Sequence, residues 1–428
     1  MDKLDILVTT MPMRGHIEPT IPIAKELASA GHRVSWYVHK EFESRLERLG
    51  IHVIRLEKRF EYSPVDFTLR NFFEARRRMI AQAKDVFVDW SLEQYEFLDI
   101  VIAAHKPDII LTDCVFFVSL LLAEKHRIPC AVFGPIPYPG SSEGTAPYGM
   151  GWQPASTSLG KIIRRLAKIA FYYGLLRQIY RYAAIRCLGQ GVRCPLGKEH
   201  IFDTVIDLSD IYLQGSLKEF EYALPDIPDK VAFIGPSLGE ESVDEHAWIA
   251  QLGKEGRPVV FATQGSVQDD PELLLRHCRE ALEGQNLDLI IANRKLAGNE
   301  ELIQRSGKLT VIAKREVDYH GILPICDVFV TNGGFHGVNA ALKHGVPMVV
   351  AGRSDDKGEV AARVARAGVG INLRTSTPSP KAIKKAVNKI LQDEDYKRKV
   401  MKMRETIRRC RTPQIARTHL ESLARSWR

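Results

Sequence analysis

The fold of the second half of this 428-residue chain is indicated by the stretch VTNGGFHGVNAALKHGVPMVVAGRSDDK (residues 330–357). An apolar run ends in a glycine pair, a helical pattern follows, and a second apolar run ends in paired aspartates. A strand, a helix and another strand in this order form a βαβ unit, whose two strands lie in parallel. The stretch therefore predicts a parallel sheet covered by helices.

The glycine pair, Gly333 and Gly334, stands where the strand passes into the helix. A residue without a side chain lets a ligand approach the backbone, and the unpaired N–H groups of a helix start attract anions such as a diphosphate. The alternative is a tight turn that binds nothing. The stretch has no GKS or GKT, and no GxGxxG follows the first apolar run, so neither a P-loop nor a dinucleotide fingerprint is present.

The same alternation of apolar runs and helical patterns occupies both halves of the chain. The expected elements are 5–10, 17–31, 33–38, 41–49, 52–56, 108–113, 115–126 and 129–133, then 257–265, 273–284, 287–293, 309–313, 327–332, 337–345, 346–352, 381–391 and 412–427. The pattern predicts an α/β protein of two Rossmann-like, doubly wound domains that face each other across a cleft. The expected divisions are an N-terminal domain (1–233), a linker (234–250), a C-terminal domain (251–411), and a last helix (412–428) that packs back on the N-terminal domain.

Composition places the chain among soluble globular proteins, with 45% hydrophobic and 26% charged residues. Its longest apolar run (115–123) is far shorter than the roughly 20 residues of a membrane span. The start, MDKLDILVTT, resembles a strand rather than a signal peptide, so a cytoplasmic location is expected. The seven scattered cysteines have no CxxC spacing, which argues against both disulfides and a zinc site. The net charge of +8 indicates a basic surface or an anionic partner, but nothing indicates nucleic acid.

His16 and Asp113 are candidates for acid–base chemistry. Both are expected at carboxyl ends of parallel strands, with His16 in the loop after the first strand, and that edge of the sheet carries the ligand. A histidine there can take a proton, and an aspartate bonded to the ring fixes its tautomer. The alternatives are a structural histidine and an aspartate that caps the helix 115–126.

Several motifs in this order resemble nucleotide-sugar-dependent glycosyltransferases of the UDP-glycosyltransferase and macrolide or natural-product superfamily, which have the GT-B fold. The motifs are MRGHIEPTIPIAKELASAGHRV (13–34), PDIILTD (107–113), FATQGS (261–266), and GVPMVV with the following acidic pair. The resemblance covers nearly the whole chain. It implies a two-domain fold and transfer of a sugar from a UDP- or dTDP-sugar, without a metal or other cofactor.

The resemblance also implies roles for individual residues. It makes His16 the general base and Asp113 its partner, in a displacement that inverts the anomeric configuration. It assigns donor binding to Gly15, Gly265, Ser266, Asn332, Gly333, Gly334, His336, Gly337, Asp356 and Lys357.

The donor motif departs from the family pattern at several positions. Asn332 stands where a histidine usually contacts phosphate, and His336, one turn later, is expected to compensate in part. Ala340 replaces the acid or amide that holds the ribose, and Glu316 replaces the aromatic residue that stacks on the base. Asp356 and Lys357 replace an Asp-Gln pair, yet both can hydrogen-bond to a sugar.

The acceptor is expected to be small and lipophilic and to lie in the N-terminal domain. Candidate lining residues, each with a core role as its alternative, are Met13, Phe72, Phe87, Phe116 and Tyr138. The segment 161–186 has seven basic residues and no acid, which indicates either helices with a basic solvent face or a weak membrane-surface contact.

The sequence thus predicts an inverting glycosyltransferase, a monomer or homodimer, that transfers sugar to a hydroxyl. Two alternatives stay open: a non-catalytic partner protein that keeps the fold, and a nucleotide-sugar epimerase on the same fold.

Overall fold

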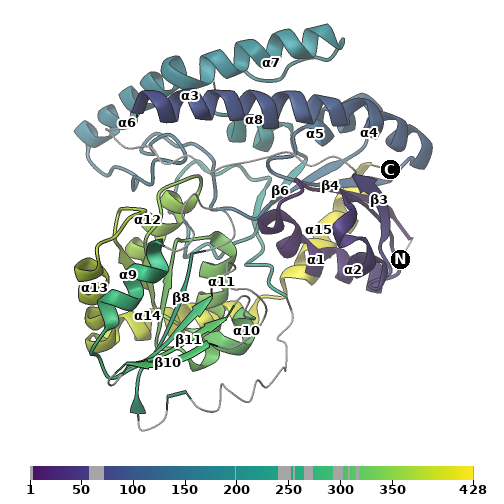
Figure 1. Cartoon of the computed structure of the whole chain (residues 1–428). Helices are drawn as coiled ribbons and strands as arrows, with labels where there is room; N and C mark the ends of the chain where they lie inside the picture. Colours follow the sequence, from purple (N-terminus) through teal and green to yellow (C-terminus); the bar gives the residue numbers. More distant parts are fainter. Residues whose placement is uncertain are drawn as a thin grey trace.

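The computed structural model contains two seven-stranded α/β units, shown in Figure 1. It describes residues 3–56, 72–197, 199–239, 252–253, 256–264, 273–292, 302–306, 309–314 and 318–427. We call the unit built on the first sheet the N-terminal lobe and the unit built on the second sheet the C-terminal lobe. The predicted fold class, two parallel-sheet α/β domains, is confirmed.

In the N-terminal lobe the sheet has the strand order β3-β2-β1-β4-β5-β6-β7, and every neighbouring pair is parallel. Its elements are β1 (Asp5–Thr9), α1 (Arg14–Ser29), β2 (Arg33–His39), η1 (Lys40–Phe42), α2 (Glu43–Glu47), β3 (His52–Leu56), α3 (Phe72–Gln82), the π-helix η2 (Ala83–Trp90), α4 (Ser91–His105), β4 (Ile109–Asp113), α5 (Val118–His126), β5 (Cys130–Gly134), α6 (Ser158–Phe171), the π-helix η3 (Tyr172–Leu176), α7 (Arg177–Gly189), α8 (Ile201–Leu208), β6 (Ile211–Gln214) and β7 (Val231–Phe233). The strand order reverses between β1 and β4, so a ligand crevice is expected at their carboxyl ends.

In the C-terminal lobe the order is β10-β11-β9-β8-β12-β13-β14. Its elements are β8 (Val259–Thr263), α9 (Leu273–Leu282), β9 (Asp288–Ala292), β10 (Leu302–Ser306), β11 (Leu309–Lys314), α10 (Tyr319–Ile322), η6 (Leu323–Ile325), β12 (Val328–Thr331), α11 (Phe335–His344), β13 (Met348–Val350), α12 (Lys357–Ala367), β14 (Gly370–Asn372), α13 (Pro380–Gln392), α14 (Glu394–Arg409) and α15 (Thr412–Trp427). The sheet is parallel except for β10, an edge strand that pairs antiparallel with β11. The corresponding reversal lies between β8 and β12.

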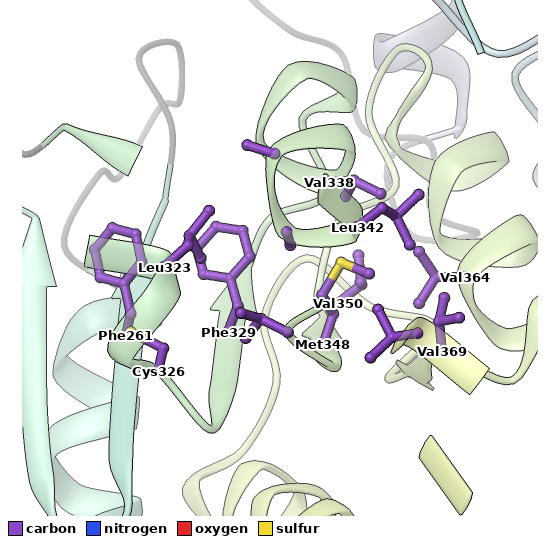
Figure 2. Close-up of a cluster of buried hydrophobic side chains, with 14 of the residues drawn as sticks. Phe261, Leu323, Cys326, Phe329, Val338, Leu342, Met348, Val350, Val364 and Val369 are labelled. Carbon is purple, nitrogen blue, oxygen red and sulfur yellow. The ribbon is translucent and has the colours of Figure 1, made fainter. Parts of the chain in front are cut away.

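Residues 330–357 form the centre of the C-terminal lobe. Figure 2 shows Val338 and Leu342 of α11 above Met348 and Val350 of β13, and all four side chains are fully buried. Gly345 ends α11 in the left-handed conformation, at a φ of 71°. This close packing fixes where α11 begins, and therefore where the glycine pair lies.

The last helix, α15, leaves the C-terminal lobe and packs beside α1 of the N-terminal lobe (Figure 1). Ala416, Leu420 and Ala424 of α15 belong to the same buried cluster as Ile17 and Ile21 of α1. This helix therefore ties the two lobes together. Among the residues that the structure describes, no helix is long and apolar enough to cross a bilayer.

Candidate active site between the lobes

His16 lies in the first turn of α1, and the expectation of a loop position is wrong. Met13 is extended (φ −119°, ψ 133°), and its carbonyl accepts the N–H groups of His16 at 2.9 Å and Ile17 at 3.0 Å. The helix therefore begins earlier than the apolar periodicity indicates. Its first turn holds the imidazole rigidly at the carboxyl end of β1.

Asp113 ends β4, the strand that pairs with β1. One carboxylate oxygen accepts the N–H of Met11 at 2.5 Å, and the other accepts those of Val115 at 2.7 Å and Phe116 at 3.2 Å. The side chain is completely buried. Asp113 therefore does stabilise the turn before α5, and the same bonds fix its carboxylate beside His16.

The ring of His16 faces the carboxylate of Asp113, with 3.6 Å between Nδ1 and Oδ1. This separation is longer than a hydrogen bond, and the buried Nδ1 has no hydrogen-bond partner within the described part of the chain. Burial acts to lower the pKa of His16, but the charges of Asp113 and, more weakly, Asp356 raise the pKa above its ordinary value of 6.5. The pair can therefore stabilise a protonated imidazole.

Charges of the two lobes interact across their interface at this point. Burial raises the pKa of Asp356 in the C-terminal lobe, and the charge of His16 in the N-terminal lobe acts to lower that pKa. A second pair of charges also interacts across the interface. Burial lowers the pKa of His336, on α11, and the charge of Glu18, on α1, opposes this shift. The starts of α1 and α11 therefore face each other, and the predicted base and the predicted anion site share one interface.

The two glycines at the start of α11 have different reasons to be glycine. Gly333 has a φ of 87°, and an added Cβ would lie 2.7 Å from Cγ1 of Val350, so the fold itself requires glycine there. Gly334 has a φ of −59°, and the nearest atom to an added Cβ is Oδ1 of Asn332 at 3.9 Å. Only Gly334 leaves open space at the helix start, where a ligand oxygen can approach.

Several other donor-binding candidates make contacts inside the C-terminal lobe. The amide nitrogen of Asn332 donates to the carbonyl of Gln264, and its side-chain oxygen accepts the N–H of Gly334 at 3.4 Å. Gly337 packs closely on Tyr319, with 3.2 Å from an added Cβ to the ring, and Ala340 is fully buried. Burial lowers the pKa of His336 and so favours its neutral ring, which offers hydrogen bonding without a positive charge.

The acidic turn before α12 is tightly arranged. Asp355 adopts a φ of 53°, which is unusual for a residue with a side chain. Lys357 donates to Asp355 at 2.9 Å, and Asp356 is the N-cap residue of α12. Strained backbone of this kind persists where the surroundings hold it, and it collects at functional sites.

The structure also brings in residues that sequence reasoning missed, at the start of α12. Glu359 accepts the N–H groups of Gly149 at 3.2 Å and Gly151 at 2.8 Å from the N-terminal lobe. Arg363 donates to Glu359 at 2.9 Å and to Glu221 at 2.5 Å. A signal was available, because charges at positions i and i+4 interrupt the apolar segment EVAARVA.

The acceptor candidates occupy different environments. Phe116 is fully buried against Trp90, and Phe87 and Met13 pack on the same cluster. Tyr138 is buried, but it lines a small pocket between the lobes that also includes Glu359 and Arg363.

The remaining candidate residues are exposed or lie outside the described part of the chain. Gly15, the second residue of α1, is exposed, and an added Cβ would meet no atom within 4 Å. Gly265, Ser266, Glu316 and the side chain of Phe72 lie outside the described residues, as does most of the expected linker.

Comparison with known proteins gives a consistent picture. The glycosyltransferase family 28 N-terminal domain matches residues 6–133, and the erythromycin biosynthesis protein CIII-like C-terminal domain matches residues 310–423. The chain is 32% identical to 4'-demethylrebeccamycin synthase of Lentzea aerocolonigenes over 406 residues, which is 94% of each chain. It is 24% identical to demethyllactenocin mycarosyltransferase of Streptomyces fradiae, over 96% of this chain and 85% of that one.

Solved structures show the same fold. The kitacinnamycin glycosyltransferase superposes with a TM-score of 0.73 at 21% identity, over 98% of both chains. A calicheamicin glycosyltransferase gives a TM-score of 0.70 at 19% identity, over 99% of this chain and 98% of that one.

Proposed function

This chain belongs to the nucleotide-sugar-dependent glycosyltransferases of natural-product biosynthesis, and from this premise we propose that it transfers a sugar, with inversion, to a hydroxyl of a small lipophilic acceptor. The observation that carries the proposal is the buried His16–Asp113 pair, which faces Asp356 and the start of α11 across the lobe interface. A relative with which the chain shares 32% identity is named a synthase of 4'-demethylrebeccamycin, and another is named a mycarosyltransferase.

In the proposed reaction the acceptor oxygen attacks the anomeric carbon of the donor sugar. The bond from that carbon to the diphosphate breaks as the new bond forms, which inverts the configuration. Nδ1 of His16 faces Asp113, so Nε2 is the atom that takes the hydroxyl proton. The fixed carboxylate of Asp113 stabilises the resulting imidazolium, as in other histidine–carboxylate pairs.

The leaving diphosphate is assigned to the start of α11. The N–H groups of a first helical turn carry partial positive charge, and Gly334 leaves room for a phosphate oxygen to approach them. In this proposal the helix start meets the leaving charge, and no metal is needed. Asp356 is assigned to a hydroxyl of the donor sugar, since a carboxylate accepts such bonds well.

A two-step experiment tests the proposal. A thermal-shift screen against nucleoside diphosphates identifies the base, because a ligand that binds the folded state raises the unfolding temperature. Mass spectrometry and NMR then follow transfer from the corresponding sugar donor to a panel of hydrophobic aglycones. We expect an O-linked product whose anomeric configuration is opposite to that of the donor. Donor binding without transfer to any aglycone would instead support the non-catalytic partner, and a donor changed in its sugar configuration would support the epimerase.

A further inference from the structure

Helix α6 presents an apolar stripe to solvent. The exposed members are Leu159, Ile162, Ile163, Leu166 and Ile169, each between 46% and 68% exposed. We call these five residues the α6 stripe. Their spacing of three and four residues places them on one face of the helix, and none of the residues of α6 is buried. A stripe of this kind normally faces the core of a protein.

The opposite, basic face of α6 is the one that contacts the protein. Lys168 donates to the carbonyl of Ser142 at 2.6 Å, and Lys161 pairs with Glu143 at 2.7 Å. Through these contacts the polar face of α6 packs against the N-terminal lobe. The usual arrangement of an amphipathic helix is therefore reversed.

A further contact on the same face involves Arg164. Its guanidinium lies 4.6 Å from the ring centre of Trp152 and donates to the carbonyl of Gln153 at 3.2 Å. Three basic residues of α6 thus hold the helix in one orientation, so the outward position of the stripe is built into the fold.

The neighbouring helix α7, unlike α6, buries an apolar face. It continues from α6 through η3, and Ile179, Tyr180 and Ala183 are buried in a cluster with Ile80 and Leu92. In Figure 1, α6 lies at one end of the helical layer that α3 and α7 form. The same helical run thus buries an apolar face in α7 and exposes one in α6.

The charge around the α6 stripe indicates what covers it. Residues 158–190 contain seven lysines and arginines and no acid. Arg165, beside the stripe, and Arg181, on α7, are both exposed. A second copy of this face would bring like charges together, whereas anionic lipid headgroups complement them. Apolar residues combined with a basic surround are typical of helices that lie in the plane of a membrane interface.

We propose that the α6 stripe docks on an anionic lipid bilayer, with its aliphatic side chains among the upper acyl chains and the nearby arginines at the headgroups. Binding of this kind combines burial of apolar area with electrostatic attraction to anionic lipid. Substitutions in the α6 stripe and at the arginines can therefore remove each contribution separately.

Vesicle co-sedimentation of the intact protein tests this proposal. At low ionic strength the protein should bind vesicles of mixed phosphatidylglycerol and phosphatidylcholine, and it should bind pure phosphatidylcholine much more weakly. The double variant Ile162→Gln/Leu166→Gln should bind the anionic vesicles roughly tenfold less, because two aliphatic groups no longer insert. Glutamine is a good helix former, so α6 should persist in this variant.

Two controls complete the experiment. Ile100→Gln changes an isoleucine that is 70% exposed on α4, outside the basic segment, and should leave vesicle binding unchanged. Arg165→Glu/Arg181→Glu should weaken binding to anionic vesicles only. Absence of binding by the parent protein, or equal binding by Ile162→Gln/Leu166→Gln, overturns the proposal. A parent dimer that this double variant converts to a monomer in sedimentation velocity also overturns it, because a second copy then covers the stripe.

Discussion

The carboxylate of Glu359 accepts the N–H of Gly151 at 2.8 Å and so joins the two lobes one helical turn from Asp356. The approach is close, since a Cβ on Gly151 would lie 2.6 Å from the carbonyl oxygen of Gly358. Arg363 completes the contact through Glu359 and Glu221. Asp356, which is proposed to hold the donor sugar, therefore directly precedes a helix whose buried side chains contact the N-terminal lobe.

The first prediction concerns the buried ion pairs of Arg363 with Glu359 and Glu221. Arg363→Met should destabilise the protein by about 3–5 kcal/mol, because it leaves two buried carboxylates without their charged partner. The side chains of both acids and the arginine are at most 7% exposed, so solvent screens their interaction little. Urea unfolding measures the change.

Arg366→Met is the matched control on the same helix. Arg366 is exposed and donates to the backbone carbonyl of Glu221 at 3.1 Å, so its loss should cost less than about 1 kcal/mol. Equal destabilisation by Arg363→Met and Arg366→Met would show that the buried network contributes nothing special.

The second prediction separates the two glycines before α11. Gly333→Ala should lower stability by about 1–3 kcal/mol, because it places a side chain at a φ of 87° and against Val350. Gly334→Ala should leave the unfolding midpoint unchanged, since its φ is ordinary and the space is open. It should nevertheless weaken binding of the nucleoside diphosphate in calorimetry. Unchanged binding by Gly334→Ala would place the diphosphate elsewhere.

The third prediction concerns pH. The pKa of His16 lies above 6.5, and a general base works only when it is unprotonated, so kcat/KM should rise with pH through that pKa. Asp113→Asn removes the main interaction that raises the pKa. The acidic limb of the variant's pH–rate profile should therefore move to lower pH. The plateau rate should fall by about 10²–10⁴, because the imidazolium loses the charge that stabilises it.

If the plateau rate falls but the acidic limb of the pH–rate profile stays at the same pH, Asp113 has a purely structural role. The same carboxylate accepts three backbone N–H groups, and the loss of these contacts would lower the plateau rate without a change in the pKa of His16. The shift in pH dependence is therefore the informative measurement for this residue.

The fourth prediction tests the interaction across the lobes. Asp356→Asn removes a charge that raises the pKa of His16, but this charge contributes less than Asp113. The acidic limb should move to lower pH by less than in Asp113→Asn, and the KM for the donor should rise. An unchanged pH profile together with an unchanged donor KM would separate Asp356 from the site.

Much of the fold could be predicted because βαβ units leave a strong local pattern. The strand at 52–56 and the helix at 412–427 agree with the structure to the residue. The start of α1 could not be located in this way, because an extended Met13 determines it and the apolar positions begin only at Ile17. The antiparallel edge strand β10 also lacked a signal, since its direction depends on tertiary pairing.

The candidate site was predictable where it follows strand ends and not where it depends on contacts between lobes. His16 and Asp113 come together because β1 and β4 are neighbours, which the alternating pattern indicates. The bond from Glu359 to Gly151 joins residues 208 positions apart. Such a contact depends on how the lobes dock, and local sequence carries little information about docking.

The role of His16 as the base is tested by a comparison of sugar transfer and donor binding in His16→Ala. Transfer should fall by about 10²–10⁴, because the acceptor hydroxyl loses its base. Affinity for the nucleoside diphosphate, measured by calorimetry on the same sample, should stay within about twofold of the parent, since His16 contacts no phosphate in the proposal. Transfer at the parental rate with normal donor affinity would contradict the assignment of His16 as the base.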